Sequence, residues 1–454
     1  MVASRAYWGN AVSGEIMSDT ESSGIRQKVL AASAGRDRVA DAVKALALAL
    51  VVVAHNLAWT VNPDGSVTNT LEAAPNLFPL TWVLQILPLF FLLAGSGLRR
   101  HAGAVTTMSV VKRIDRLVTP AVLLLLVTAV LSALLSQVAG STIGQYAGLL
   151  PMQLTWFLGV YLMVVAVSSL LAKMTRWWHF ALMLVVIAIV DALRVAISEQ
   201  IGWVNLLLVW AYFAALGLQL PKLRELPRSI LAVGALGSAG LAVAAVVFGP
   251  YSAALVTTAA CPGLSNLAPP TIVLALAGTA QICVLLLLRP MLERMLRSDR
   301  RWIPVAVFSS RAMGIYLWHM LILSLCVGVA TSLTLAPTPL GAGWWGLHLV
   351  VFTIVITVVW LISPTLLRLS DSLIKTLSRL VPDGVSQAIR SLPPTVVAWA
   401  AAIVGVVMAL ASESGLSDLL TPRLVIGLPY VPAAALLILV SAAALSRAAQ
   451  AHER

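Results

Sequence analysis

Twelve separate stretches of this 454-residue chain are apolar over about the length that a helix needs to cross a bilayer. The composition agrees, since 60% of the residues are hydrophobic and 11% are charged, whereas soluble domains carry about 25% charged residues. We therefore predict an all-α polytopic membrane protein. The stretches run over residues 41–60, 78–98, 117–138, 151–171, 179–197, 202–220, 229–249, 268–288, 305–332, 343–367, 394–412 and 423–446.

The polar segments between these stretches predict how the chain is divided. Residues 1–37 are mixed and polar and have neither the short apolar region nor the cleavage signal of a signal peptide, so we expect a disordered cytoplasmic tail. Residues 368–393 alternate apolar with basic positions, which predicts a cytoplasmic amphipathic linker whose first half is an interfacial helix. This leaves a ten-helix domain over 38–367 and an accessory two-helix hairpin with a short tail over 394–454.

Basic residues are distributed unevenly along the chain, which has a formal net charge of +12. The connections between stretches are alternately rich and poor in Lys and Arg, and the poor ones contain only Arg194 and Arg423. This positive-inside pattern predicts an inner-membrane protein with both termini in the cytoplasm. It also accounts for the basic excess through topology and contact with anionic membrane lipids, so no nucleic-acid partner is expected.

Cysteine usage indicates neither a disulfide framework nor a metal site. Cys261, Cys283 and Cys326 lie far apart and do not have the spacing of metal ligands. We expect no metal and no tightly bound cofactor.

The first apolar stretch carries charged residues at one end and a histidine further along. Eleven residues separate Lys44 from His55, and at about 100° per residue the two side chains share one face of a helix, roughly 16 Å apart along its axis. That spacing predicts His55 near the middle of the membrane, where an ionisable group usually marks a functional site. The alternative is a structural histidine that is hydrogen-bonded between helices.

Arg113 and Arg116 are three residues apart and therefore lie on one helical face at the predicted cytosolic membrane edge. Such a pair suits a ligand that bears phosphate, because the guanidinium fork binds phosphate oxygens in a fixed geometry. The alternative is ordinary positive-inside anchoring. Asp115, between them, is a candidate local counter-ion.

Other polar or aromatic residues within the apolar stretches are further candidates. Trp156 belongs either to an interfacial aromatic belt or to a substrate site. Asp191 and Arg194 are spaced to pair with each other, either as a structural ion pair or as part of an outward-facing acceptor site. The last group, Arg311, Tyr316 and His319, recurs at helical spacing and is expected to face a common interior, whereas His348 stands alone and is expected to be structural.

Five of these segments, in this order, resemble the motifs of the membrane-bound acyltransferase 3 family. The resemblance covers residues from about 36 to 367, and the final two apolar stretches lie outside it. The family's Arg is replaced by Lys44, and Ala94 and Ser96 stand at the Ser and Phe positions of its Ser-Gly-Phe. The matching segments are Arg38, Asp41, Lys44 and His55; Phe90, Phe91 and Ala94 to Ser96; Arg113 and Arg116; Trp156 to Leu158; and Tyr316 with His319.

The resemblance implies an O-acyltransferase that moves an acyl group, commonly acetyl, from cytoplasmic acyl-CoA to a hydroxyl of a cell-envelope glycan or glycolipid. On that basis Lys44, Arg113 and Arg116 are expected to hold the phosphate end of the donor. His55, neutral among apolar helices, is expected to be the general base. Asp41 is grouped with it as an orienting counter-ion. Trp156, Arg311, Tyr316, His319, Asp191 and Arg194 are candidates for the substrate site.

Two other functions stay open at this point. The first is a transporter or flippase for a lipid-linked sugar, with His55, Asp191 and Arg194 forming a polar pathway, although the sequence has no internal repeat of the kind that many transporters show. The second is an inactive relative of the enzymes, because Lys44 and Ala94 depart from the family pattern.

Overall fold

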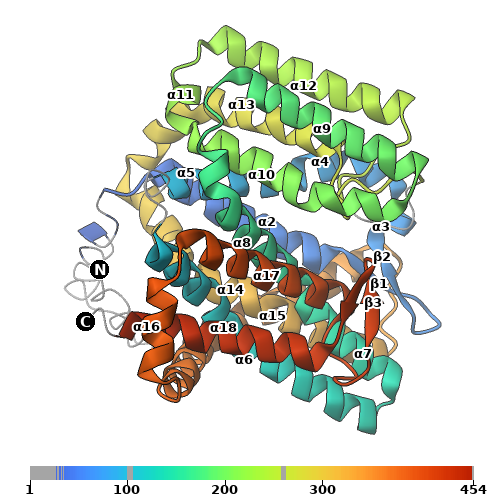
Figure 1. The fold of residues 1–454 in the computed structure, drawn as a ribbon. Helices are drawn as coiled ribbons and strands as arrows, with labels where there is room; N and C mark the ends of the chain where they lie inside the picture. Colours follow the sequence, from blue (N-terminus) through green and yellow to red (C-terminus); the bar gives the residue numbers. More distant parts are fainter. Residues whose placement is uncertain are drawn as a thin grey trace.

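The computed structural model of the chain describes residues 27, 30, 31, 33, 35–99, 106–256 and 262–451. Most of the predicted N-terminal tail, residues 1–37, lies outside these residues. Within the described part the fold is a bundle of long helices with two short β-hairpins at one end (Figure 1).

Twelve segments of the described chain are helical, long and apolar enough to span a membrane, which confirms the predicted all-α polytopic class. Three short helices, α3 (Thr70–Ala73), α11 (Leu220–Arg224) and α16 (Asp383–Ser391), lie between them. The spanning segments are formed by α2 (Arg38–Leu57); η1 (Pro75–Leu80), α4 (Thr81–Leu84) and α5 (Leu87–Arg99); α6 (Thr107–Val138); α7 (Ser141–Leu149), η2 (Leu150–Leu154) and α8 (Thr155–Leu171); α9 (Trp177–Ala196); η3 (Glu199–Val204) and α10 (Asn205–Leu218); α12 (Arg228–Phe248); α13 (Ile272–Leu296); α14 (Asp299–Ser332); α15 (Ala342–Ser378); α17 (Pro394–Ser414); and α18 (Pro432–Ala451).

The first spanning helix lies three residues earlier than predicted at both ends. Asp37 begins it, because its carboxylate accepts a hydrogen bond from the backbone N–H of Ala40 at 3.0 Å and so caps the helix. The helix ends at Leu57, and the chain then forms a hairpin of β1 (Trp59–Val61) and β2 (Val67–Asn69). His55 therefore lies in the last turn of α2 and not midway along it.

Two later boundaries also differ from prediction. Residues 423–430 form a second hairpin, β3 (Arg423–Val425) with β4 (Leu428–Tyr430), so the last helix starts at Pro432. The expected interfacial helix after residue 367 is the continuation of α15 to Ser378, because no glycine or proline follows Pro364 to end the helix there. Ser370 and Ile374 are fully buried in that continuation.

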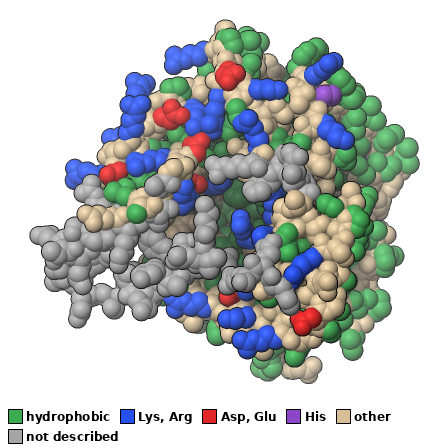
Figure 2. All heavy atoms as spheres, turned by 60° about the vertical axis from the view of Figure 1, so that its left-hand side comes forward, with side chains coloured by type: hydrophobic (Ala, Val, Ile, Leu, Met, Phe, Trp, Pro, Cys, Tyr) green, Lys and Arg blue, Asp and Glu red, His purple; other side chains and the backbone are tan. Residues whose placement is uncertain are grey.

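One end of the bundle, which we call the basic end, collects the start of α2, the end of α13 and the start of α14. Arg38 ties them together: its guanidinium donates to the carbonyl oxygens of Leu296 (2.9 Å) and Arg297 (3.1 Å) and pairs with Asp299 (3.3 Å). Lys and Arg side chains gather on this face around a hollow (Figure 2). The opposite end, where α2 ends and the β1–β2 hairpin begins, we call the loop end (Figure 1).

The last two spanning helices pack within the bundle. Helix α17 lies against α8 so closely that a Cβ on Gly159 would come within 2.4 Å of the Gly405 carbonyl oxygen. Small residues allow this approach of two backbones, as is common between membrane helices. Helix α18 packs along α6. The division of the chain into a ten-helix domain and a separate hairpin stays a prediction, and these contacts place both helices beside the segments that carry the family motifs.

Asp37 also joins two other elements at the basic end, and this gives a testable contribution to stability. Its carboxylate pairs with Arg224 at 2.8 Å and with Arg289 at 2.9 Å. Burial alone would raise the pKa of Asp37, but the Ala40 N–H and the two guanidinium groups together hold it below the ordinary value of 3.8.

We predict that Asp37→Asn, which keeps a capping side chain, lowers the free energy of unfolding by about 1 kcal/mol at neutral pH. Because the folded-state pKa is depressed, the carboxylate contributes stability above about pH 3.8 and loses it as the pH falls further. Melting curves of the purified protein should therefore differ between wild type and variant at pH 7 and converge below pH 3.8. A difference that persists in acid would show that the ion pairs are not its source.

Candidate active site

Two histidines from helices far apart in the sequence meet inside the bundle. Nδ1 of His55, on α2, lies 3.2 Å from Nε2 of His319, on α14, and the rings are stacked with their centroids 5.4 Å apart. His319 is fully buried, whereas His55 is partly exposed. Sequence reasoning placed both residues in the site but did not predict that they contact each other.

The surroundings of His319 determine where the protons lie on both rings. Its Nδ1 faces the carbonyl oxygens of Ile315 (2.9 Å) and Tyr316 (3.0 Å), which can only accept, so Nδ1 carries the hydrogen. In a neutral ring Nε2 then holds a lone pair and accepts the hydrogen on Nδ1 of His55. The remaining nitrogen of His55, Nε2, is left with a lone pair, and no hydrogen bond to it is formed by the described residues. His55 is therefore set up to accept a proton at Nε2.

A second histidine contact holds the end of α2 in place. Asn56 donates to the backbone carbonyl of His348 at 3.1 Å, and Nδ1 of His348 contacts the Asn56 carbonyl oxygen at 2.6 Å. The His348 ring packs between Trp59 and Trp344, with centroids 4.4 and 3.9 Å away. These contacts join α2 to α15 beside His55, which supports the structural role that the sequence predicted for His348.

The aromatic motif residues of α5, α8 and α14 meet in one cluster near the histidines. The ring centroid of Phe157 is 4.7 Å from that of Phe90, 5.1 Å from that of Phe91 and 5.7 Å from that of Tyr316. Tyr316 also donates a hydrogen bond to the carbonyl of Leu154 in η2. Three of the segments that sequence comparison singled out separately are therefore neighbours in space.

Trp156 joins the same cluster through Trp210, with ring centroids 5.6 Å apart. Trp210 lies on α10, and α10 crosses α5 closely beside this cluster. A Cβ on Gly95 would lie 2.0 Å from the Ala214 carbonyl oxygen, and one on Gly217 would lie 1.9 Å from that of Leu92. The glycine of the Ala94-Gly95-Ser96 motif is thus required for packing.

Lys44 and Asp41 lie toward the basic end of α2. Lys44 is half-buried, and within the described chain its ammonium group forms neither a hydrogen bond nor an ion pair. Asp41 pairs with Arg36 at 2.7 Å. Fourteen residues of helix, about 21 Å, separate Asp41 from His55, so the structure does not bring the two predicted catalytic residues together.

Arg113 and Arg116 lie on α6 near Tyr161 of α8, close enough for their charges to influence its phenol. Phe157 and Tyr161 are four residues apart and share one face of α8, which extends from the aromatic cluster toward the two arginines. The expected counter-ion, Asp115, has a different partner: it pairs with Arg447 of α18 at 3.0 Å.

Asp191 and Arg194 are both buried but do not form the predicted ion pair. The Asp191 carboxylate accepts hydrogen bonds from Asn205 (2.8 Å), from Tyr251 (3.1 Å) and from the backbone N–H of Ile272 (2.8 Å). Arg194 pairs with Glu199 at 3.1 Å. Each charge thus joins α9 to neighbouring elements, which supports a structural role.

Arg311 also departs from the prediction. Its guanidinium donates to the Trp360 carbonyl at 3.2 Å and lies over the Trp360 ring at 5.3 Å. It therefore faces α15, whereas Tyr316 and His319 face α8 and α2. Helical spacing alone did not separate these two directions.

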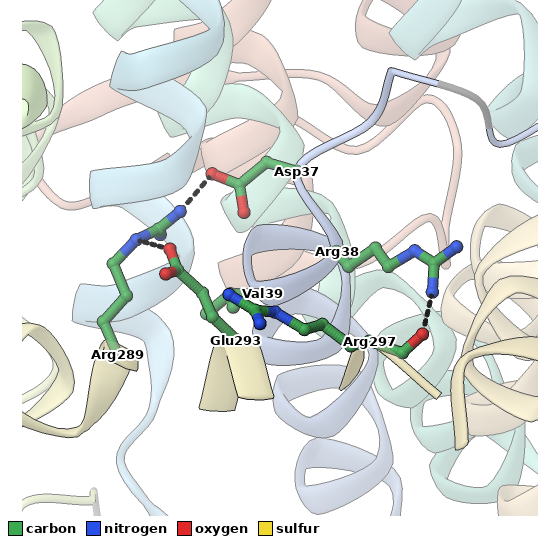
Figure 3. Close-up of a pocket in the computed structure, with 6 residues that line it drawn as sticks. All are labelled: Asp37, Arg38, Val39, Arg289, Glu293 and Arg297. Atoms are coloured by element: carbon green, nitrogen blue, oxygen red, sulfur yellow. Dashed lines mark hydrogen bonds and ion pairs between the residues drawn. The ribbon is translucent and has the colours of Figure 1, made fainter. Parts of the chain in front are cut away.

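A cavity of about 530 Å³ opens at the basic end between the start of α2 and the end of α13 (Figure 3). Most of its charges are already paired: Arg289 binds Asp37 and Glu293, and Arg38 binds backbone carbonyls and Asp299. This cavity is accordingly a salt-bridged joint between helices.

One of the comparisons with known proteins gives a match. Searches of curated proteins and of solved structures found no match. The model of the acyltransferase 3 family, described as an acyltransferase domain, matches residues 38–364, which include every motif segment described above. The chain belongs to the acyltransferase 3 family and is a multi-pass membrane acyltransferase.

Proposed function

We propose that this acyltransferase moves an acyl group, acetyl in the simplest case, from cytoplasmic acyl-CoA to a hydroxyl of a cell-envelope glycan or glycolipid. The observation that carries the proposal is the His55–His319 hydrogen bond, which leaves Nε2 of His55 as a proton acceptor. The basic end then faces the cytoplasm of an inner-membrane protein, as the positive-inside rule predicts.

The position of His55 supports a reaction between substrates that arrive from opposite sides. Seventeen residues of helix, about 25 Å, separate it from Arg38 at the basic end, and the chain turns into the β1–β2 hairpin only a few residues after it. An acceptor can reach it from the loop end, while a donor extends inward from the basic end. A histidine midway along α2 would be further from the acceptor side.

The donor is assigned to the basic end by the Lys and Arg side chains that gather there. Lys44 shares the face of α2 that carries His55, roughly 16 Å further along, and Arg113 and Arg116 approach Tyr161 on the neighbouring α8. Guanidinium and ammonium groups are suited to the phosphates of coenzyme A. The thioester arm lies between these groups and the histidine.

The chemistry follows from the proton positions. The acceptor hydroxyl gives its proton to Nε2 of His55 while its oxygen attacks the thioester carbonyl carbon. The C–S bond breaks, and His55 returns the proton to the departing thiolate, which leaves an ester, free CoA and a neutral imidazole. His319 holds the ring of His55 and stabilises the charge that appears on it during the transfer, because its Nε2 accepts from Nδ1.

We predict that membranes containing the wild type transfer label from radiolabelled acetyl-CoA into lipid or glycan, and that His55→Ala lowers this transfer 10²- to 10⁴-fold, the usual contribution of a general base. His179→Gln is the matched control, because His179 lies at the start of α9 and bonds only locally to Arg176. Equal labelling by wild type and His55→Ala would remove His55 from the mechanism. No labelling with acetyl or longer acyl donors would contradict the proposed reaction.

The donor assignment predicts effects on the donor KM. Lys44→Arg should retain activity and Lys44→Ala should lose most of it, while Arg113→Ala and Arg116→Ala should raise the KM of acyl-CoA more than that of the acceptor. Arg300→Ala removes an equal charge from an exposed position at the basic end and should change neither value. Donor kinetics that stay at the wild-type value in the Lys44 and arginine variants would leave these residues as topology anchors only.

A further inference from the structure

The segment outside the family match contributes to the basic end through Arg447. This residue lies on α18, more than eighty positions beyond residue 364. Its Nε donates to Asp115 Oδ1 at 3.0 Å, and a terminal nitrogen donates to Asp371 Oδ1 at 2.8 Å. One guanidinium therefore joins α18 to α6 and to the end of α15.

Asp115 is an unfavourable residue for an anion-binding helix unless its charge is neutralised. It lies between Arg113 and Arg116 in the sequence, and its carboxylate is buried, with the residue only 8% exposed. Its other partner is neutral: the hydroxyl of Thr119 donates to it at 2.7 Å. An uncompensated carboxylate there would repel the phosphates that the two arginines attract, with little screening by solvent.

Neighbouring contacts fix the same region of α6. The backbone carbonyl of Thr119 accepts a hydrogen bond from the fully buried Ser370 at 2.5 Å, and Thr107 donates to the carbonyl of Leu392 at 2.6 Å. Arg390 of α16 donates to the Ala449 carbonyl near the end of α18 at 2.9 Å. The C-terminal segment thus holds α6 at its start and at the Asp115 level.

We propose that Arg447 is a positioning residue for the acyl donor: it neutralises Asp115, so that this carboxylate does not repel the phosphates of coenzyme A near Arg113 and Arg116. This inference rests on the donor assignment of the proposed function. It also gives the last spanning helix a role in the donor site that the family pattern does not include.

The test is the binding of coenzyme A to the purified full-length protein, measured as the CoA concentration that gives half of the maximal rise in melting temperature. Arg447→Met should raise that concentration roughly tenfold, since a buried negative charge then faces the phosphates. Asp115→Asn combined with Arg447→Met should return it close to the wild-type value, because the buried carboxylate is gone and Asp371, the other partner of Arg447, is about half exposed to solvent. A purely structural role predicts that the double variant is no better than the single one.

Arg390→Met provides the structural control, because it loosens the anchoring of α18 without touching Asp115. It should leave CoA binding at the wild-type value. Any of three results would overturn the inference. The first is unchanged CoA binding in Arg447→Met, and the second is CoA binding by the double variant that is as weak as that of the single variant. The third is an equal loss of CoA binding in Arg390→Met. If the single variant does not fold, the double variant still decides: near-normal CoA binding supports the proposal and weakened binding overturns it.

The label-transfer assay separates this inference from the proposed function. Wild-type transfer from acetyl-CoA with normal CoA binding by Arg447→Met would overturn only the role of Arg447. Absence of both transfer and CoA binding in the wild type would overturn both.

Discussion

The hydrogen bond between His55 and His319 is the interaction on which the rest of the site depends. The two nitrogens are 3.2 Å apart, so one ring must present a lone pair to the hydrogen of the other. The two rings therefore cannot both be positively charged imidazolium ions. The carbonyls of α14 decide the direction of that bond, and the Asn56–His348 contact holds the end of α2 where the bond can form. Helix packing thereby determines which nitrogen of His55 can act as a base.

Sequence patterns predicted the parts of this structure that depend on a single helix. The twelve spans follow from the length of apolar chain that crosses a bilayer, and the common face of Lys44 and His55 follows from helical spacing. Ends of helices were less predictable. Three observed helix ends differ from prediction, because Asp37 caps α2 and because hairpins form after Leu57 and before Pro432. The recognised motifs identified His319 as a site residue without indicating its partner.

Contacts between helices could not be predicted, because they depend on how each helix is rotated in the bundle. Asp191 and Arg194 have the right spacing to pair with each other. In the structure, however, Asp191 binds Asn205 and Tyr251, and Arg194 pairs with Glu199. Arg311 shares a helix with His319 but faces Trp360. Arg447 gave only a weak signal, a single arginine near the end of the last apolar stretch, and its partner Asp115 lies 332 residues earlier.

The two ends of the bundle divide the work that the proposed reaction requires. Basic side chains gather at the end where α2 begins, and the histidine pair lies near the end where the β1–β2 hairpin follows. Between them the aromatic residues of α5, α8 and α14 form an apolar wall, with Phe157 at its centre. In the proposed reaction, this wall would keep water away from the thioester and so protect the acyl group from hydrolysis.

The most direct measurement of the central claim is the protonation of the two histidines by nitrogen NMR of the purified protein labelled with ¹⁵N-histidine, with His55→Gln and His319→Leu used for assignment. We predict that both rings are neutral and that both carry hydrogen on Nδ1, with Nε2 of His55 unprotonated. In His319→Leu the His55 ring should lose this preference, because the acceptor for its Nδ1 hydrogen is gone. A wild-type His55 with hydrogen on Nε2, or an imidazolium at neutral pH, would contradict the account.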